Sequence, residues 1–133
     1  MLTITPSPFL RQALVADATT SMACGLLMLL GAGPLTGILG LPAELLRASG
    51  LVLLPYALFV GYLGMRPHPQ KPVIWAVIIA NVVWAADSVL LLASGWVEPT
   101  RAGYAFVIAQ ALAVLMYAEL QYMGLRRSHA ATA

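Results

Sequence analysis

The chain of 133 residues has little charge and almost no cysteine, and both shortages exclude whole classes of protein. Only 9% of its residues are charged, whereas ordinary soluble domains have roughly 25%. This chain therefore has too few charged residues to cover a surface exposed to water. Cys24 is the single cysteine, which excludes a disulfide framework, a CxxC redox pair and a cysteine-based zinc site. The two histidines, His68 and His129, lie outside the apolar stretches and therefore cannot be mid-membrane haem ligands.

Apolar residues dominate what remains, at 61% of the chain with a mean hydropathy of +0.87. Charges and helix breakers divide the sequence into four long apolar stretches, each near the roughly 20 residues that cross a membrane. None of them alternates as a membrane β-strand would. The sequence predicts an all-α membrane protein, a single domain over residues 1–133 with four transmembrane helices in an up-down bundle. The expected spans cover about 12–32, 46–65, 72–95 and 102–125.

The connecting segments predict the orientation of the bundle. Residues 31–42 hold four glycines and two prolines, and we expect an interfacial or partly re-entrant loop there. Cations are more frequent in segments that stay in the cytoplasm. Two cations, Arg47 and Arg101, fall on one predicted side, and five fall on the other: Arg11, Arg66, Lys71, Arg126 and Arg127. We therefore expect both termini in the cytoplasm. No basic stripe is interleaved with aromatic residues, so we expect no nucleic-acid partner.

The second and fourth spans end alike, in YLGMR at 62–66 and YMGLR at 122–126. This likeness suggests two tandem helical hairpins related by a parallel repeat, although apolar sequence also produces such likeness by chance. Small residues predict packing faces between membrane helices. They recur every fourth position in the first span and the fourth span, at Ala13, Asp17, Ser21 and Gly25 and at Ala105, Ala109 and Ala113. The same faces could serve a homo-oligomer or a membrane protein partner.

Three carboxyl groups fall within the predicted spans, at Asp17, Asp87 and Glu119. Placing an ionisable side chain at the centre of a membrane helix costs roughly 2.5–3.5 kcal/mol of insertion free energy. The presence of each of these carboxyl groups therefore calls for a structural or functional explanation. One interpretation is a polar cavity on the cytoplasmic side with a path leading outward, which could carry protons or hold a ligand. The candidate residues are Asp17, Glu119, Tyr117 and Gln121 for the cavity, Asp87, Asn81 and Trp84 for the path, and Gln110 on the Tyr117 face.

A purely structural interpretation stays open for the same carboxyl groups. Asp17 and Glu119 could reach the interface or pair with Arg11, Arg126 or Arg127. Asp87 could bond across to another helix or reach Arg101.

Three segments resemble small four-helix bacterial membrane proteins of the broad DoxX-like type. They are GLP at 40–42, LRASG at 46–50 and NVVWAAD at 81–87. The resemblance implies the four-helix fold and a multi-pass protein of the bacterial inner membrane. Some proteins of that type are associated with quinone-linked respiratory oxidoreductases, but no family catalytic motif carries over to this chain.

The sequence carries no visible nucleophile arrangement, metal-ligand set or haem pair. We therefore expect neither a metal nor another cofactor, and no enzyme activity is indicated. The favoured hypothesis is a membrane protein that binds a lipid, a quinone or another hydrophobic small molecule, or a protein partner. The alternative is a small proton-linked transporter or channel that uses the intramembrane carboxyl groups.

Overall fold

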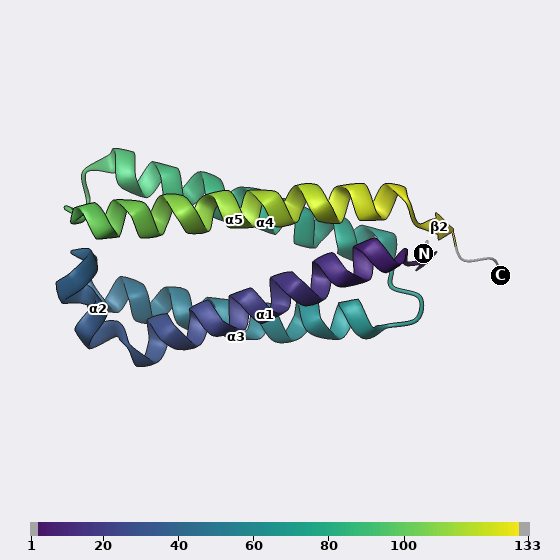
Figure 1. The fold of residues 1–133 in the computed structure, drawn as a ribbon, viewed down its shortest axis with the longest axis horizontal. Coiled ribbons are helices and arrows are strands. Elements are labelled where there is room, and N and C mark those ends of the chain that lie inside the picture. The colour runs from purple at the N-terminus through teal and green to yellow at the C-terminus, as the bar shows by residue number, and fades with distance from the viewer. Residues whose placement is uncertain (1–2, 131–133) are drawn as a thin grey trace.

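The protein is an all-α bundle, as predicted, with four helices long and apolar enough to cross a membrane. The computed structural model describes residues 3–130. The four long helices are α1 (Pro8–Leu30), α3 (Ala43–Met65), α4 (Lys71–Ser94) and α5 (Arg101–Arg126). Figure 1 shows two antiparallel hairpins side by side, α1 with α3 and α4 with α5. The predicted spans coincide with these helices over most of their lengths, so length and hydropathy located them correctly.

The first connection is not the loop that the sequence predicted. A short helix, α2 (Ala32–Leu39), occupies it, and its two terminal residues are buried. Gly40 ends the helix with a φ of 70°, a left-handed conformation that glycine adopts without strain. The carbonyl oxygen of Leu39 accepts a hydrogen bond from Thr100 N at 3.0 Å. The apolar segment is therefore a helix that packs against the start of α5.

Two hydroxyl side chains each cap the start of one helix and donate a hydrogen bond to another helix. Ser7 caps α1, and its Oγ also donates to the carbonyl oxygen of Gly124 at 2.8 Å. Thr100 caps α5, and its Oγ1 also donates to the carbonyl oxygen of Ile38 at 2.7 Å. Each cap satisfies a first-turn N–H that has no partner within its own helix. One such tie lies at each end of the bundle.

The described ends of the chain are fastened together beside the connection between α3 and α4. Strand β1 (Ile4–Thr5) pairs antiparallel with β2 (His129–Ala130). The Ile4 N–H donates to the carbonyl oxygen of Pro69 at 3.0 Å, and Thr3 bridges Gln70. Figure 1 shows these segments gathered at one end of the molecule, with α2 at the other. We call the two regions the terminal half and the α2 half.

Helices approach most closely at small residues. A Cβ added at Gly50 would lie 2.6 Å from the carbonyl oxygen of Gly25, and one added at Gly124 would lie 2.6 Å from Leu10 Cα. The predicted packing row of the first span is confirmed, because Ala13, Asp17, Ser21 and Gly25 are all buried. The row predicted for the fourth span is wrong. Ala105 and Ala109 are exposed, since α5 turns a different face inward, made of Gly103, Val107, Ala111, Ala118, Gln121, Gly124 and Leu125.

Buried apolar side chains form two separate clusters, one in each half of the bundle. The terminal cluster contains Ile4, Leu10, Leu14, Ala18, Val60, Leu63, Ile74, Val77, Ile78, Ala118 and Leu125. The α2 cluster contains Met28, Ala32, Leu39, Leu41, Leu46, Leu53 and Val107. Tyr56 packs against the terminal cluster and Trp84 against the α2 cluster.

Candidate functional site

A cluster of polar side chains lies at the centre of the bundle, around Asp17, whose side chain is completely buried. Oδ2 of Asp17 accepts hydrogen bonds from Tyr56 Oη at 2.9 Å, Asn81 Nδ2 at 3.1 Å and Gln121 Nε2 at 2.8 Å. Its Oδ1 accepts a hydrogen bond from Ser21 Oγ at 3.1 Å. Since α1, α3, α4 and α5 each supply a member, this Asp17 cluster joins both hairpins.

Asp17 is surrounded by neutral donors: the four side chains that hydrogen-bond to it are two amides and two hydroxyls. No buried side-chain nitrogen or oxygen in residues 3–130 lacks a hydrogen-bond partner. A fully satisfied network is favourable in an apolar interior, because an unpaired polar group there costs about 1–3 kcal/mol. The structural interpretation of Asp17 as a partner of Arg11 is wrong, since Arg11 Nη1 donates to the carbonyl oxygen of Gly64 instead.

Tyr56 is placed so that its one hydroxyl hydrogen has two acceptors. Its Oη lies 2.9 Å from Asp17 Oδ2 and 2.9 Å from Asn81 Oδ1. The Asn81 amide orientation follows from its other contacts, because Nδ2 faces the acceptors Asp17 Oδ2 and Gln121 Oε1. If Asp17 Oδ2 were protonated, its O–H could donate a hydrogen bond to Tyr56 Oη, and the Tyr56 hydroxyl would then donate its own hydrogen bond to Asn81 Oδ1. The cluster can therefore accept one proton without losing a contact.

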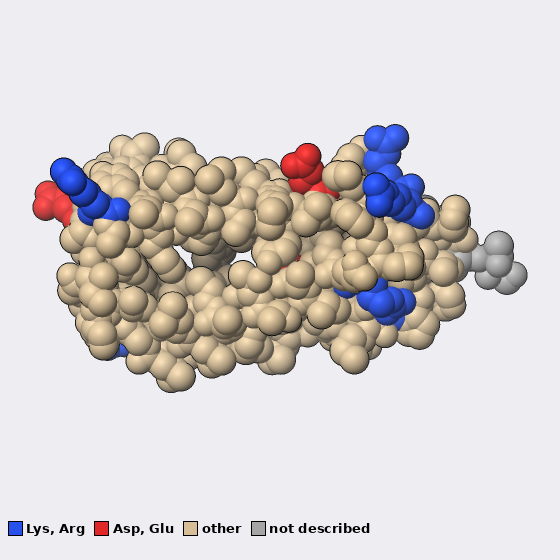
Figure 2. Space-filling model, viewed as in Figure 1, with Lys and Arg blue, Asp and Glu red and all other residues tan. Residues whose placement is uncertain are grey.

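The cluster separates a closely packed interior from a hollow one. On the terminal side, large side chains such as Leu10, Leu14 and Ile74 are completely buried and close the bundle. On the α2 side, a cavity of about 120 Å³ lies between the hairpins, with Ser21, Tyr56 and Asn81 in its wall. Its other lining residues are Val52, Leu53, Ala80, Trp84 and Val114. Figure 2 shows openings between the hairpins in this half of the molecule.

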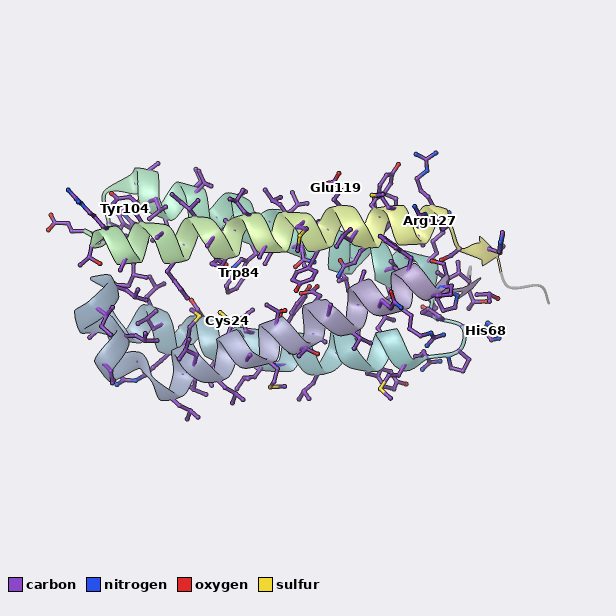
Figure 3. All side chains as sticks on the ribbon, viewed as in Figure 1. Cys24, His68, Trp84, Tyr104, Glu119 and Arg127 are labelled. Atoms are coloured by element: carbon purple, nitrogen blue, oxygen red, sulfur yellow. The ribbon has the colours of Figure 1, made fainter. Side chains whose placement is uncertain are left out.

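Trp84 stands between this cavity and a second one of about 60 Å³ nearer α2, and it lines both. Its Nε1 donates to Gln110 Oε1 at 2.7 Å, and Gln110 Nε2 donates to Ser88 Oγ at 2.8 Å. Figure 3 shows the Trp84 side chain extending into the space between the hairpins. The indole therefore forms a hydrogen-bonded partition in the hollow half.

The structure brings together only some of the residues predicted for the site. Asp17, Asn81 and Gln121 meet in the central cluster, and Trp84 contacts Gln110. Tyr117 lies apart from both groups, with its hydroxyl 2.6 Å from Thr20 Oγ1.

Asp87 and Glu119 are exposed on outer faces of the bundle. Figure 3 shows Glu119 pointing away from the other hairpin. Each lies seven residues from the end of its helix, hence about 10 Å along the axis. Neither hydrogen-bonds to another side chain in residues 3–130, so the structure does not place them with Asp17.

Sequence reasoning missed the part of the cluster that comes from α3. Tyr56 was absent from the predicted site, although it lies in the middle of an apolar span beside Pro55. Ser21 was noticed only as a small packing residue. A signal for Ser21 was available, because it lies four residues after Asp17 and therefore on the same helical face.

In residues 3–130 no group of three or more His, Cys, Asp or Glu side chains could hold a metal ion. Comparisons with known protein families, characterised proteins and solved structures find no match to this chain. The resemblance to DoxX-like proteins therefore stays a prediction.

Proposed function

We propose that this multi-pass membrane protein binds an apolar molecule with a hydrogen-bonding head group, such as a quinone, in the cavity beside Asp17. The observation that carries the proposal is the composition of the cavity wall. Four apolar side chains and an indole surround the space, and three polar side chains of the Asp17 cluster lie in the same wall. Small-molecule sites in proteins combine these features, with apolar walls for affinity and a few polar groups for orientation.

The dimensions of the cavity favour a single ring as the head group. Its volume of about 120 Å³ is near that of an engineered apolar cavity of roughly 150 Å³ that binds benzene. Tyr56 and Asn81, which join α3 to α4 through a 2.9 Å hydrogen bond, lie in the cavity wall. A ligand carbonyl oxygen could replace Asn81 Oδ1 as the acceptor of the Tyr56 hydroxyl hydrogen, and an apolar tail could leave between α3 and α4 toward the membrane.

Fluorescence of Trp84 tests this proposal directly, since the indole lines the cavity. Trp75→Phe and Trp96→Phe leave Trp84 as the single tryptophan, and a short-chain benzoquinone is added to the protein in lipid nanodiscs. We expect saturable quenching, weakened at least tenfold by Val114→Phe, which fills the cavity. Leu112→Phe is the matched control, because Leu112 is on the same helix but 62% exposed. Unsaturable quenching that is equal in all three proteins would contradict the proposal.

A second candidate function is proton-linked transport, and the two hydrogen-bond arrangements open to Tyr56 favour it. The Asp17 cluster lies where the hollow half of the bundle meets the half with the closely packed interior, and it can take up one proton without losing a contact. Proton flux into vesicles that contain the protein, driven by a pH gradient, tests this candidate. Flux that disappears in Asp17→Asn and persists in Asp87→Asn supports it. Equal flux from empty vesicles and from the wild-type protein rejects it.

A further inference from the structure

A groove separate from the Asp17 cavity opens between the end of α3 and the start of α4. It has a volume of about 240 Å³. Apolar side chains of both helices form its walls: Phe59 and Leu63 from α3 and Val73 from α4. Arg66 and Gln70 line it toward the terminal end of the molecule. The groove therefore combines apolar walls with a cation at one end.

Within residues 3–130 the Arg66 guanidinium makes one side-chain hydrogen bond, which leaves most of its donors for other partners. Its Nη1 donates to Tyr62 Oη at 2.5 Å, and its Cζ lies 5.4 Å from the centre of the Tyr62 ring. Arginine has five N–H donors, so one bond to Tyr62 leaves four. Because the arginine side chain packs on an aromatic ring beside the groove, it is partly ordered before any ligand binds.

The start of α4 adds positive potential to the same place. The helix begins at Lys71, has no acidic residue in its first turn, and receives no side-chain cap from Gln70. The N-terminal end of a helix carries a partial positive charge, which favours a nearby anion. Arg66 and the positive end of α4 thus lie together at one end of an apolar groove.

The terminal end of the molecule also carries most of its cations. Five of the seven Lys and Arg residues are there: Arg11, Arg66, Lys71, Arg126 and Arg127. Figure 2 shows blue side chains gathered at this end. Basic pockets between transmembrane helices attract anionic lipid head groups.

From these observations we infer that the groove between α3 and α4 binds one anionic phospholipid. The phosphate contacts the Arg66 guanidinium beside the start of α4, and an acyl chain lies along Phe59, Leu63 and Val73. A free phosphate ion would use the cations but would leave the apolar walls uncovered. The walls therefore favour a lipid as the source of the phosphate. This site is independent of the Asp17 cavity, so either proposal can fail without the other.

Native mass spectrometry of the full chain in detergent, with phosphatidylglycerol and phosphatidylcholine in equal amounts, tests this inference. We expect the wild-type protein to retain phosphatidylglycerol preferentially, with one tightly bound copy. Arg66→Gln should reduce that preference about fivefold, the size expected for one cation near a lipid surface. Arg101→Gln at the other end of the bundle is the matched control and should leave the preference unchanged. An equal reduction by both variants, or no preference in the wild-type protein, would overturn the inference.

Two further measurements separate the lipid from a bare anion and from a loss of folding. Val73→Trp places a large ring in the groove and should weaken phosphatidylglycerol binding while Arg66 is still present. Arg66→Lys keeps the positive charge and should restore most of the preference lost in Arg66→Gln, with an unchanged melting temperature. Complete displacement of phosphatidylglycerol by excess inorganic phosphate, with no effect of Val73→Trp, would show that the groove contributes nothing.

Discussion

In the interior of the terminal half the two hairpins touch, and only an outer groove opens between the end of α3 and the start of α4. In the α2 half, cavities separate the hairpins in the interior. Gly124 brings the α5 backbone against Leu10 of α1, and Leu10, Leu14 and Ile74 are completely buried. Beyond the Asp17 cluster Trp84 packs against the α2 cluster and lines the open space between the hairpins.

The difference follows from which side chains face inward and how the chain is tied. In membrane helices, small residues permit close backbone approach, and polar groups hold helices together across gaps. The terminal half is held together by close backbone approach at small residues and by the pairing of β1 and β2. In the α2 half, Trp84, Gln110 and Ser88 hydrogen-bond to one another within the α4–α5 hairpin. The two hairpins are joined there where Thr100 bonds to the carbonyl oxygens of Ile38 and Leu39. The bundle is therefore closely packed in one half and hollow in the other, although helix ends are tied together in both.

The largest expected effect comes from removing the group that joins the two halves. Asp17→Leu leaves Tyr56, Asn81 and Gln121 without their shared acceptor and should lower the free energy of unfolding by about 3 kcal/mol or more. Asp87→Leu is the control, because it replaces an exposed carboxyl group and should be neutral or stabilising. Denaturant unfolding in detergent micelles measures both. Equal losses in the two variants would show that Asp17 has no special role.

A smaller loss is expected where the hairpins touch. Gly124→Ala places a Cβ 2.6 Å from Leu10 Cα, and such overpacking costs about 1–3 kcal/mol. Gly37→Ala in α2 is the matched substitution, since no atom lies within 4 Å of its added Cβ. Loss of a helical glycine there should stabilise the protein by up to about 1 kcal/mol. Melting temperatures that shift in the same direction would contradict the contrast between the halves.

The same contrast predicts how each half tolerates a larger side chain. Ala118 is 4% exposed within the terminal cluster, so Ala118→Leu should cost about 1–3 kcal/mol. Ala80 lines the cavity, so Ala80→Leu should cost less than about 1 kcal/mol because the added atoms fill existing space. The comparison uses thermal unfolding in the same detergent. A larger loss for Ala80→Leu would mean that the cavity cannot accept added atoms.

The smallest effect concerns the two capping hydroxyls, where we expect the halves to behave alike. Ser7→Ala and Thr100→Ala each remove a helix cap and a tie to another helix end, and each should cost about 1 kcal/mol. Measured unfolding free energies that differ by more than about 1 kcal/mol would show that one tie is much stronger than the other.

Hydropathy predicted the four helices well because the requirement is local: roughly 20 apolar residues must lie together for a helix to cross a membrane. The same local reasoning identified Asp17 and Asn81 as residues that needed an explanation. It could not rank Asp17 above Asp87 or Glu119, since all three are acidic residues within apolar spans. Only the rotation of each helix decides which carboxyl faces the interior.

By itself, then, the sequence determined the membrane-spanning class, the number of long helices and the presence of rare polar groups within them. The tertiary structure decided that Asp17 meets Tyr56, Asn81 and Gln121 while Asp87 and Glu119 face outward. It also decided that one half is hollow. These properties depend on packing between residues far apart in the chain. In a membrane both the packing faces and the lipid-facing faces of a helix are apolar, so hydropathy does not distinguish them in the sequence.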